Sequence, residues 1–173
     1  MDVIKLETLI AYLTDHTVIR EKKALQKLVY FCAEAGVPLC AKFRLYINGP
    51  YSNEVAEELE EVVIKEIVKF SPYGYTYLRG TECDNYLVRD REDINTYREK
   101  IQKVLDVFGE MSPLDIELHA TIHFIATALN EAYGQVTEEK VVKEVYMAKG
   151  DNFSIQRIKS AYHDLLDWGW LRK

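Results

Sequence analysis

Hydrophobic residues recur at intervals of three and four along most of the chain, which is the spacing of amphipathic helices. This pattern predicts helices over residues 2–13, 21–35, from 52 onwards, 94–108, 113–132, 138–149 and 155–168. The helix over 113–132 is apolar almost all round, so we expect it to be central and buried. In the helix over 21–35, we place Lys27, Tyr30 and Glu34 on the polar side, opposite the apolar arc.

Hydroxyl side chains stand at the predicted start of four helices. Such a side chain accepts a hydrogen bond from a backbone N–H group that has no partner within the helix. The four predicted capping residues are Ser52, Ser112, Thr137 and Ser154.

Residues 67–78 carry the clearest β pattern, with two apolar runs separated by Ser71-Pro72-Tyr73-Gly74, and they predict a hairpin. Tyr73, Tyr75 and Tyr77 alternate along it, so we expect them to share one face. That face either packs over neighbouring helices or forms an exposed aromatic strip at a protein interface. A shorter extended segment over 43–47 ends at Asn48-Gly49-Pro50.

The order of helix, helix, acidic helix and hairpin predicts a winged-helix-like lobe. Residues 80–93 are strongly polar and suggest a boundary, giving a lobe over 1–80 and a helical part over 81–173, or a single compact domain. In the second part, the helices over 138–149 and 155–168 are followed by Gly169 and an extended apolar segment over 170–173. That order predicts a second helix-turn-helix-like unit running into a wing. The fold class is therefore α+β and mostly helical.

Composition narrows the class of protein. The chain has 173 residues, of which 48% are hydrophobic and 29% charged, which excludes a disordered or low-complexity chain. No window approaches the roughly 20 apolar residues of a membrane span, and the first residues resemble neither a signal nor a transit peptide. The three cysteines contain no CxxC motif and favour neither a disulfide framework nor a zinc site. We therefore expect a cytoplasmic protein.

The net charge of −6 is unevenly distributed. Between residues 20 and 44, six basic residues stand against two acidic ones, a local charge of +4. Between residues 51 and 66, six glutamates stand against one lysine, a local charge of −5. These segments form either two solvated helix faces or a bipolar surface for a charged protein partner. In the second interpretation the contact residues are Glu57, Glu58 and Glu61, together with the three hairpin tyrosines.

Binding of DNA is the alternative. The acidic helix after Ser52 repels phosphate, so a DNA contact has to come from the C-terminal helices. The residues there that suit a groove or a phosphate are Lys149, Gln156, Arg157 and Lys159. Asp164 and Asp167 offset their charge.

Candidate catalytic chemistry is sparse. His119 and His123 stand four residues apart on one helix, a spacing that can chelate a metal ion. Ala120, however, stands where the metalloprotease motif needs glutamate. The sequence has neither a glycine-rich phosphate loop nor a GxSxG motif. We therefore assign no catalytic residue and no cofactor.

Three stretches carry a family resemblance: LQKLVYF at residues 25–31, YINGPYS at 46–52 and LHATI at 118–122. Through them the chain resembles the YwgA-like group of small prokaryotic proteins and, more distantly, the Panacea domain of SocA-type antitoxins. The resemblance implies a cytoplasmic prokaryotic accessory protein. In the Panacea family, function runs through protein partners, by neutralising a toxin or presenting it to a protease. No catalytic residue carries over.

Three functional hypotheses follow from the sequence. The first is a non-enzymatic regulatory module, antitoxin-like or adaptor-like, that binds a protein partner. The second is a DNA-binding winged-helix regulator, and the third is a metal-assisted hydrolase that uses His119 and His123. A homodimer is compatible with each of them, and none of them involves a membrane.

Overall fold

The computed structural model describes residues 3–172 and is mostly helical, with small antiparallel sheets, as the α+β prediction requires. The chain forms two compact units. The first comprises the chain up to Arg44 together with Tyr51–Pro113, and the second comprises Leu45–Pro50 together with the chain from Leu114 onwards. The short segment Leu45–Pro50 is thus an insertion from the first unit's part of the chain into the second unit. Asp2 and Lys173, which the sequence placed in a helix and in an extended end, lie outside the described residues.

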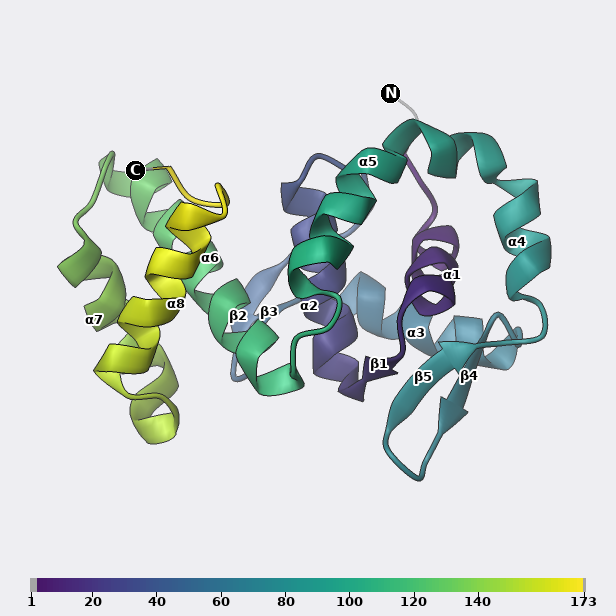
Figure 1. Cartoon of the computed structure of the whole chain (residues 1–173), viewed down its shortest axis with the longest axis horizontal. Helices are drawn as coiled ribbons and strands as arrows, with labels where there is room; N and C mark the ends of the chain where they lie inside the picture. Colours follow the sequence, from purple (N-terminus) through teal and green to yellow (C-terminus); the bar gives the residue numbers. More distant parts are fainter. Residues whose placement is uncertain (1–2, 173) are drawn as a thin grey trace. The chain divides into compact units, whose positions relative to one another are not determined.

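The first unit combines five helices, counted within residues 3–113, with one three-stranded sheet (Figure 1). The sheet has the antiparallel order β1-β5-β4, in which Ile19 pairs with Tyr77 and Tyr77 with Phe70, and it includes the predicted hairpin. Its elements are α1 (Leu6–His16), β1 (Ile19–Arg20), α2 (Glu21–Glu34), α3 (Asn53–Ile64), β4 (Val68–Ser71), β5 (Thr76–Arg79), α4 (Cys83–Arg89) and α5 (Arg91–Phe108).

Helix α2 lies at the centre of this unit, and its predicted polar side is wrong at two positions. Lys27 and Tyr30 are each only 1% exposed. The Tyr30 ring meets Phe43 edge-on, and Phe31 stacks on Phe108 of α5 with ring centroids 3.8 Å apart. Because neighbouring elements pack on several sides of α2, its burial is wider than its apolar arc indicates.

A buried glutamine fixes the start of α3. The Gln26 side chain donates to the Ser52 carbonyl and accepts from the Ser52 N–H, both at 2.9 Å. The Ser52 hydroxyl in turn accepts from the N–H of Val55, which confirms the predicted cap. The LQKL and GPYS stretches are therefore joined by hydrogen bonds, because Gln26 satisfies backbone groups that water cannot reach.

Residues 80–93 lie within the first unit, although the sequence suggests a boundary there. They form α4 and the beginning of α5, and α4 packs on α1 while α5 packs on α2. Cys83 is fully buried, and the Thr8 hydroxyl donates to Asp90 at 2.5 Å. The polar character of the stretch reflects the exposed side of short helices, and the compact unit continues to Pro113.

The second unit is built from three helices, α6 (Pro113–Tyr133), α7 (Glu138–Lys149) and α8 (Ile155–Asp167), with a 3-10 turn, η1 (Gly150–Asn152). Thr137 caps α7 and Ser154 caps α8, as predicted. The inserted segment lies within a two-stranded sheet of β2 (Arg44–Tyr46) and β3 (Gly49–Tyr51). Helix α6 is buried along most of its first half, as expected.

The expected extended wing after α8 is wrong for residues 170–172, in which residues 170 and 171 form a bend and no strand is present. The N–H groups of Trp170 and Leu171 both donate to the Leu165 carbonyl, at 2.8 and 3.2 Å. These bonds fold the chain back onto the end of α8, so this segment cannot continue as a strand. Across residues 3–172, none of the helices has the length and apolar character needed to span a bilayer.

The two hydrogen bonds of Gln26 predict a clear cost of removal. We expect Gln26→Leu to lower the free energy of unfolding by about 3 kcal/mol, because a buried N–H and a buried carbonyl lose their partner. Denaturant unfolding measures the change, with Gln102→Leu on the exposed side of α5 as the matched control. Equal stability of the two variants would contradict the role assigned to Gln26.

Candidate protein-interaction surface

Helix α3 divides cleanly into a buried and an open side. Its buried side consists of Val55, Leu59 and Val62. The opposite side exposes Glu57, Glu60 and Glu61, which we call the acidic stripe. Their spacing places them together on the helix surface, one turn before Ile64, which is 73% exposed. None of the three carboxylates has a hydrogen-bond or ion-pair partner among the described residues, so the stripe leaves its charge unneutralised.

Glu58, a predicted contact residue, lies apart from the acidic stripe. It is half-buried, and burial raises the pKa of its carboxyl group, with the charge of Glu7 adding to the effect. Glu7 itself is held by Lys65 at 3.1 Å and by Arg89 at 2.9 Å. Glu58 therefore belongs to the junction of α1 and α3, and Glu60 is the third member of the open surface that sequence reasoning missed.

The three hairpin tyrosines do not form one exposed strip. Tyr73 is 99% exposed and Tyr75 67% exposed, whereas Tyr77 is only 4% exposed. Tyr77 lies opposite Ile19 on the covered face of the sheet, with its ring 5.0 Å from that of Phe70. Of the two alternatives, the exposed strip is wrong for Tyr77, which is covered, and the open aromatic rings are those of the loop between β4 and β5.

Lys149 is buried, which contradicts its expected place on a DNA-binding surface. It is 5% exposed, and its Nζ atom lies 2.6 Å from Oε2 of Glu117, itself 4% exposed. The same ammonium group donates to the Ile47 carbonyl at 2.8 Å and lies 5.9 Å from the Phe153 ring centroid. Lys149 therefore holds the inserted segment Leu45–Pro50 to the helices of the second unit.

The other predicted DNA contacts lie on α8. Gln156 and Lys159 are exposed, while the Arg157 guanidinium donates to the Asp115 carboxylate at 3.0 Å. Arg157 thus braces α8 against the start of α6. Two of the four predicted contact residues remain open on this surface.

The two histidines are packed into the second unit. His119 is 2% exposed, with Nδ1 at 2.7 Å from the Asp115 carbonyl and Nε2 at 3.2 Å from the Asp164 carboxylate. His123 hydrogen-bonds the Trp170 carbonyl at 3.1 Å, and burial lowers its pKa to about 4. Within residues 3–172, no group of three or more His, Cys, Asp or Glu side chains could hold a metal ion.

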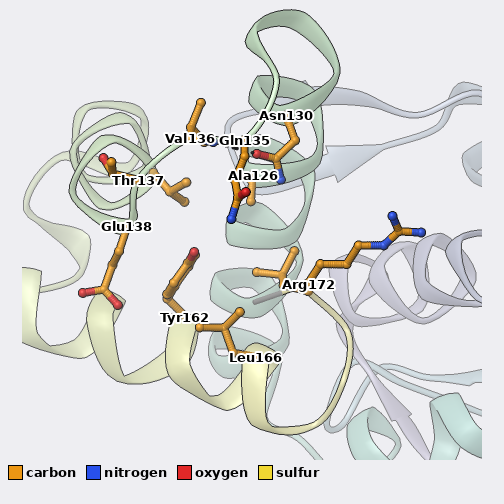
Figure 2. Close-up of a pocket in the computed structure, with 11 residues that line it drawn as sticks. Ala126, Asn130, Gln135, Val136, Thr137, Glu138, Tyr162, Leu166 and Arg172 are labelled. Atoms are coloured by element: carbon orange, nitrogen blue, oxygen red, sulfur yellow. Dashed lines mark hydrogen bonds between the residues drawn. The ribbon is translucent and has the colours of Figure 1, made fainter.

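A pocket of about 480 Å³ opens between the helices of the second unit (Figure 2). Its size falls within the range of small-molecule sites, and it was missed in the sequence because its walls come from separate segments. Gln135 and Tyr162 point toward one another across it, and the Arg172 guanidinium points away. Burial raises the pKa of Tyr162, and the charge of Glu138 adds to that. The lining residues are Ala126, Asn130, Gln135, Val136, Thr137, Glu138, Val141, Tyr162, Leu166, Leu171 and Arg172.

Comparison of the chain with protein-family models and with curated proteins finds no match.

His123 predicts a loss of stability in acid. Its folded pKa of about 4 lies below the ordinary 6.5, so the unfolded chain binds its proton first as the pH falls. Its contribution is complete above about pH 6.5 and is lost as the pH falls toward about 4. From about pH 7 to about pH 4.5, we expect it to account for about 2 kcal/mol. Denaturant unfolding should show that His123→Gln, whose amide can still donate to the Trp170 carbonyl, loses less stability in acid than the original chain. An identical loss of stability would contradict the lowered pKa of His123.

Removing the Lys149 ammonium group leaves the Glu117 carboxylate buried without its ion pair. We expect Lys149→Met to lower the unfolding free energy by about 3 kcal/mol, and the double variant Lys149→Met/Glu117→Leu to recover part of that loss. The matched control is Lys159→Met, an exposed position where we expect a change below about 0.5 kcal/mol. Equal effects of the two lysine substitutions would show that the buried pair has no special role.

Proposed function

We propose that this chain is a non-enzymatic regulatory module that binds a basic protein partner through the acidic stripe of α3. The observation that carries the proposal is the set of three open, unneutralised carboxylates on one helix face. Other acidic groups in the same unit, including Glu7, Asp15 and Asp90, are held by basic side chains. The chain thus leaves the charge of α3 available for a partner.

The proposal places the acidic stripe on the third helix of a winged-helix-like lobe. With the separate pair β2 and β3 set aside, which stands between α2 and α3, the order α1, β1, α2, α3, β4, β5 and the sheet order β1-β5-β4 support this assignment. In DNA-binding winged helices the third helix enters the major groove, where positive and amide side chains are favoured. Three glutamates there oppose a phosphate backbone and favour lysine and arginine side chains of a protein.

The hairpin loop offers a second contact. Tyrosine is enriched in protein interfaces, because its ring supplies apolar area and its hydroxyl remains a hydrogen-bonding group. Tyr73 and Tyr75 present such rings to solvent. We infer that the carboxylates draw the partner in, while the loop tyrosines contribute buried area in the complex.

The alternative of a DNA-binding regulator has less support. It relies on α8, where Lys149 is committed to Glu117 and Arg157 to Asp115, leaving Gln156 and Lys159. The third hypothesis, a metal-assisted hydrolase, also has little support, because both ring nitrogens of His119 are already hydrogen-bonded.

Charge reversal tests the proposed function directly. We expect Glu57→Lys/Glu60→Lys/Glu61→Lys to reduce capture of the partner from a lysate of the source cells about tenfold or more, because attraction becomes repulsion. Capture by the original chain should also weaken as salt rises from about 50 to about 300 mM. Quantitative mass spectrometry of the captured proteins provides the readout.

The control carries three reversals elsewhere on the first unit, at exposed Glu92, Glu99 and Glu110. It should retain the same captured proteins as the original chain. Unfolding curves establish that both triple variants remain folded. Undiminished capture by the α3 variant would contradict the proposal.

A further inference from the structure

On one face of the three-stranded sheet of the first unit, the paired strand residues are exposed or half-buried, including the half-buried Leu78 opposite Lys69. Cross-strand partners in an antiparallel sheet project on the same side. Ile19, Tyr77 and Phe70 form a row on the covered side. The next row, Arg20, Thr76 and Ser71, therefore projects on the opposite side, and Lys69 follows two residues before Ser71 on β4. We call Arg20, Lys69, Ser71 and Thr76 the outer row.

Within residues 3–172, the cations of the outer row have no acidic partner. Arg20 and Lys69 are exposed, and neither makes a hydrogen bond or ion pair with any residue in the described part of the chain. Arg79, at the end of β5, differs, because Asp15 and Asp84 both hold its guanidinium group. The Ser71 and Thr76 hydroxyls lie between the two open cations and are half-buried.

The same surface continues to the hairpin loop. The N–H of Glu21 donates to the Tyr75 carbonyl at 2.8 Å, which fixes the start of α2 beside the loop. Lys22 follows, exposed and likewise without a partner among residues 3–172. Glu21 is the one acidic residue in this stretch from Arg20 to Lys22. The Tyr75 ring lies 6.4 Å from that of Phe70, on the covered side of the sheet, so Tyr73 is the open ring of the loop that the three cations border.

We infer that the outer row, with Lys22 and Tyr73, binds single-stranded nucleic acid. Arg20, Lys22 and Lys69 attract the phosphates, and the Ser71 and Thr76 hydroxyls can donate to phosphate oxygens. Tyr73 is open on all sides of its ring, so an unpaired base can stack on it.

A single strand fits this surface better than a duplex. Major-groove binding needs a helix that enters the groove, and the third helix of this lobe carries the acidic stripe, which repels phosphate. A sheet face with basic side chains and an accessible aromatic ring is, by contrast, a common platform for single-stranded bases. The inference goes beyond the proposed protein contact and uses different charged residues.

Fluorescence anisotropy with labelled oligothymidylate and oligouridylate of about 15 nucleotides tests the inference. At about 50 mM salt, we expect saturable binding whose affinity falls with a salt slope of about −2, as three single-strand phosphate contacts require. Arg20→Ala/Lys22→Ala/Lys69→Ala should weaken binding about tenfold or more and flatten that slope. Tyr73→Ala should weaken it about fivefold with little change in slope.

The matched control removes three exposed lysines of the second unit, as Lys140→Ala/Lys143→Ala/Lys159→Ala, and should leave the affinity unchanged. The acidic-stripe variant should bind the oligonucleotides at least as tightly as the original chain, so this test and the protein-capture test fail separately. The inference would be overturned by an absence of binding at about 50 mM salt or by tighter binding of a duplex of the same length. It would also be overturned if the two triple alanine variants lost the same affinity.

Discussion

The buried ion pair of Lys149 and Glu117 is the constraint on which the second unit depends. The chain leaves the first unit after Arg44, returns at Tyr51 and leaves again after Pro113, so the second unit includes a six-residue segment from a distant part of the sequence. That segment is too short to hold itself in place. The Lys149 ammonium group donates a hydrogen bond to the Ile47 carbonyl, and the Glu117 carboxylate balances its charge. The buried ammonium group requires these partners, because Lys149 and Glu117 are shielded from water. Ser52 follows five residues after Ile47. Its backbone is fixed by the side chain of Gln26, which thereby fixes the start of α3.

The charged groups of the first unit fall into two classes. Glu7, Asp15 and Asp90 are paired with lysine or arginine and join α1 to neighbouring elements. The carboxylates of the acidic stripe and the cations of the outer row have no such partners among residues 3–172. An exposed charge without an ion-pair partner costs little stability. The stability of the fold therefore does not require that these charges cluster by sign. We propose that the acidic stripe binds a protein and that the outer row binds single-stranded nucleic acid.

Local sequence signals predicted the local structure well. The sequence predicted the hairpin and the helix caps at Ser52, Thr137 and Ser154, because each of them depends on a few adjacent residues. The failures share a different cause. Lys27 and Tyr30 are buried on the predicted polar side of α2, and Lys149 contacts Glu117 and Ile47, which lie far away in the sequence. Helical periodicity does not register such contacts. Likewise, the polar stretch over 80–93 gives no sign of the helices that it packs against. For the candidate site, charge runs predicted the acidic surface, while the division of the tyrosines depended on the register of β5 with β1.

We propose above that the acidic stripe of α3 contacts a protein partner. Site-specific photo-crosslinking in the source cells tests it most directly, with the photoreactive side chain at position 60 on the acidic stripe or at position 99 on α5. We expect a discrete protein adduct from position 60 that is absent from position 99, and we expect the crosslinked peptide of the partner to be rich in lysine and arginine. Nucleic-acid adducts from position 60, or the same adducts from both positions, would contradict it.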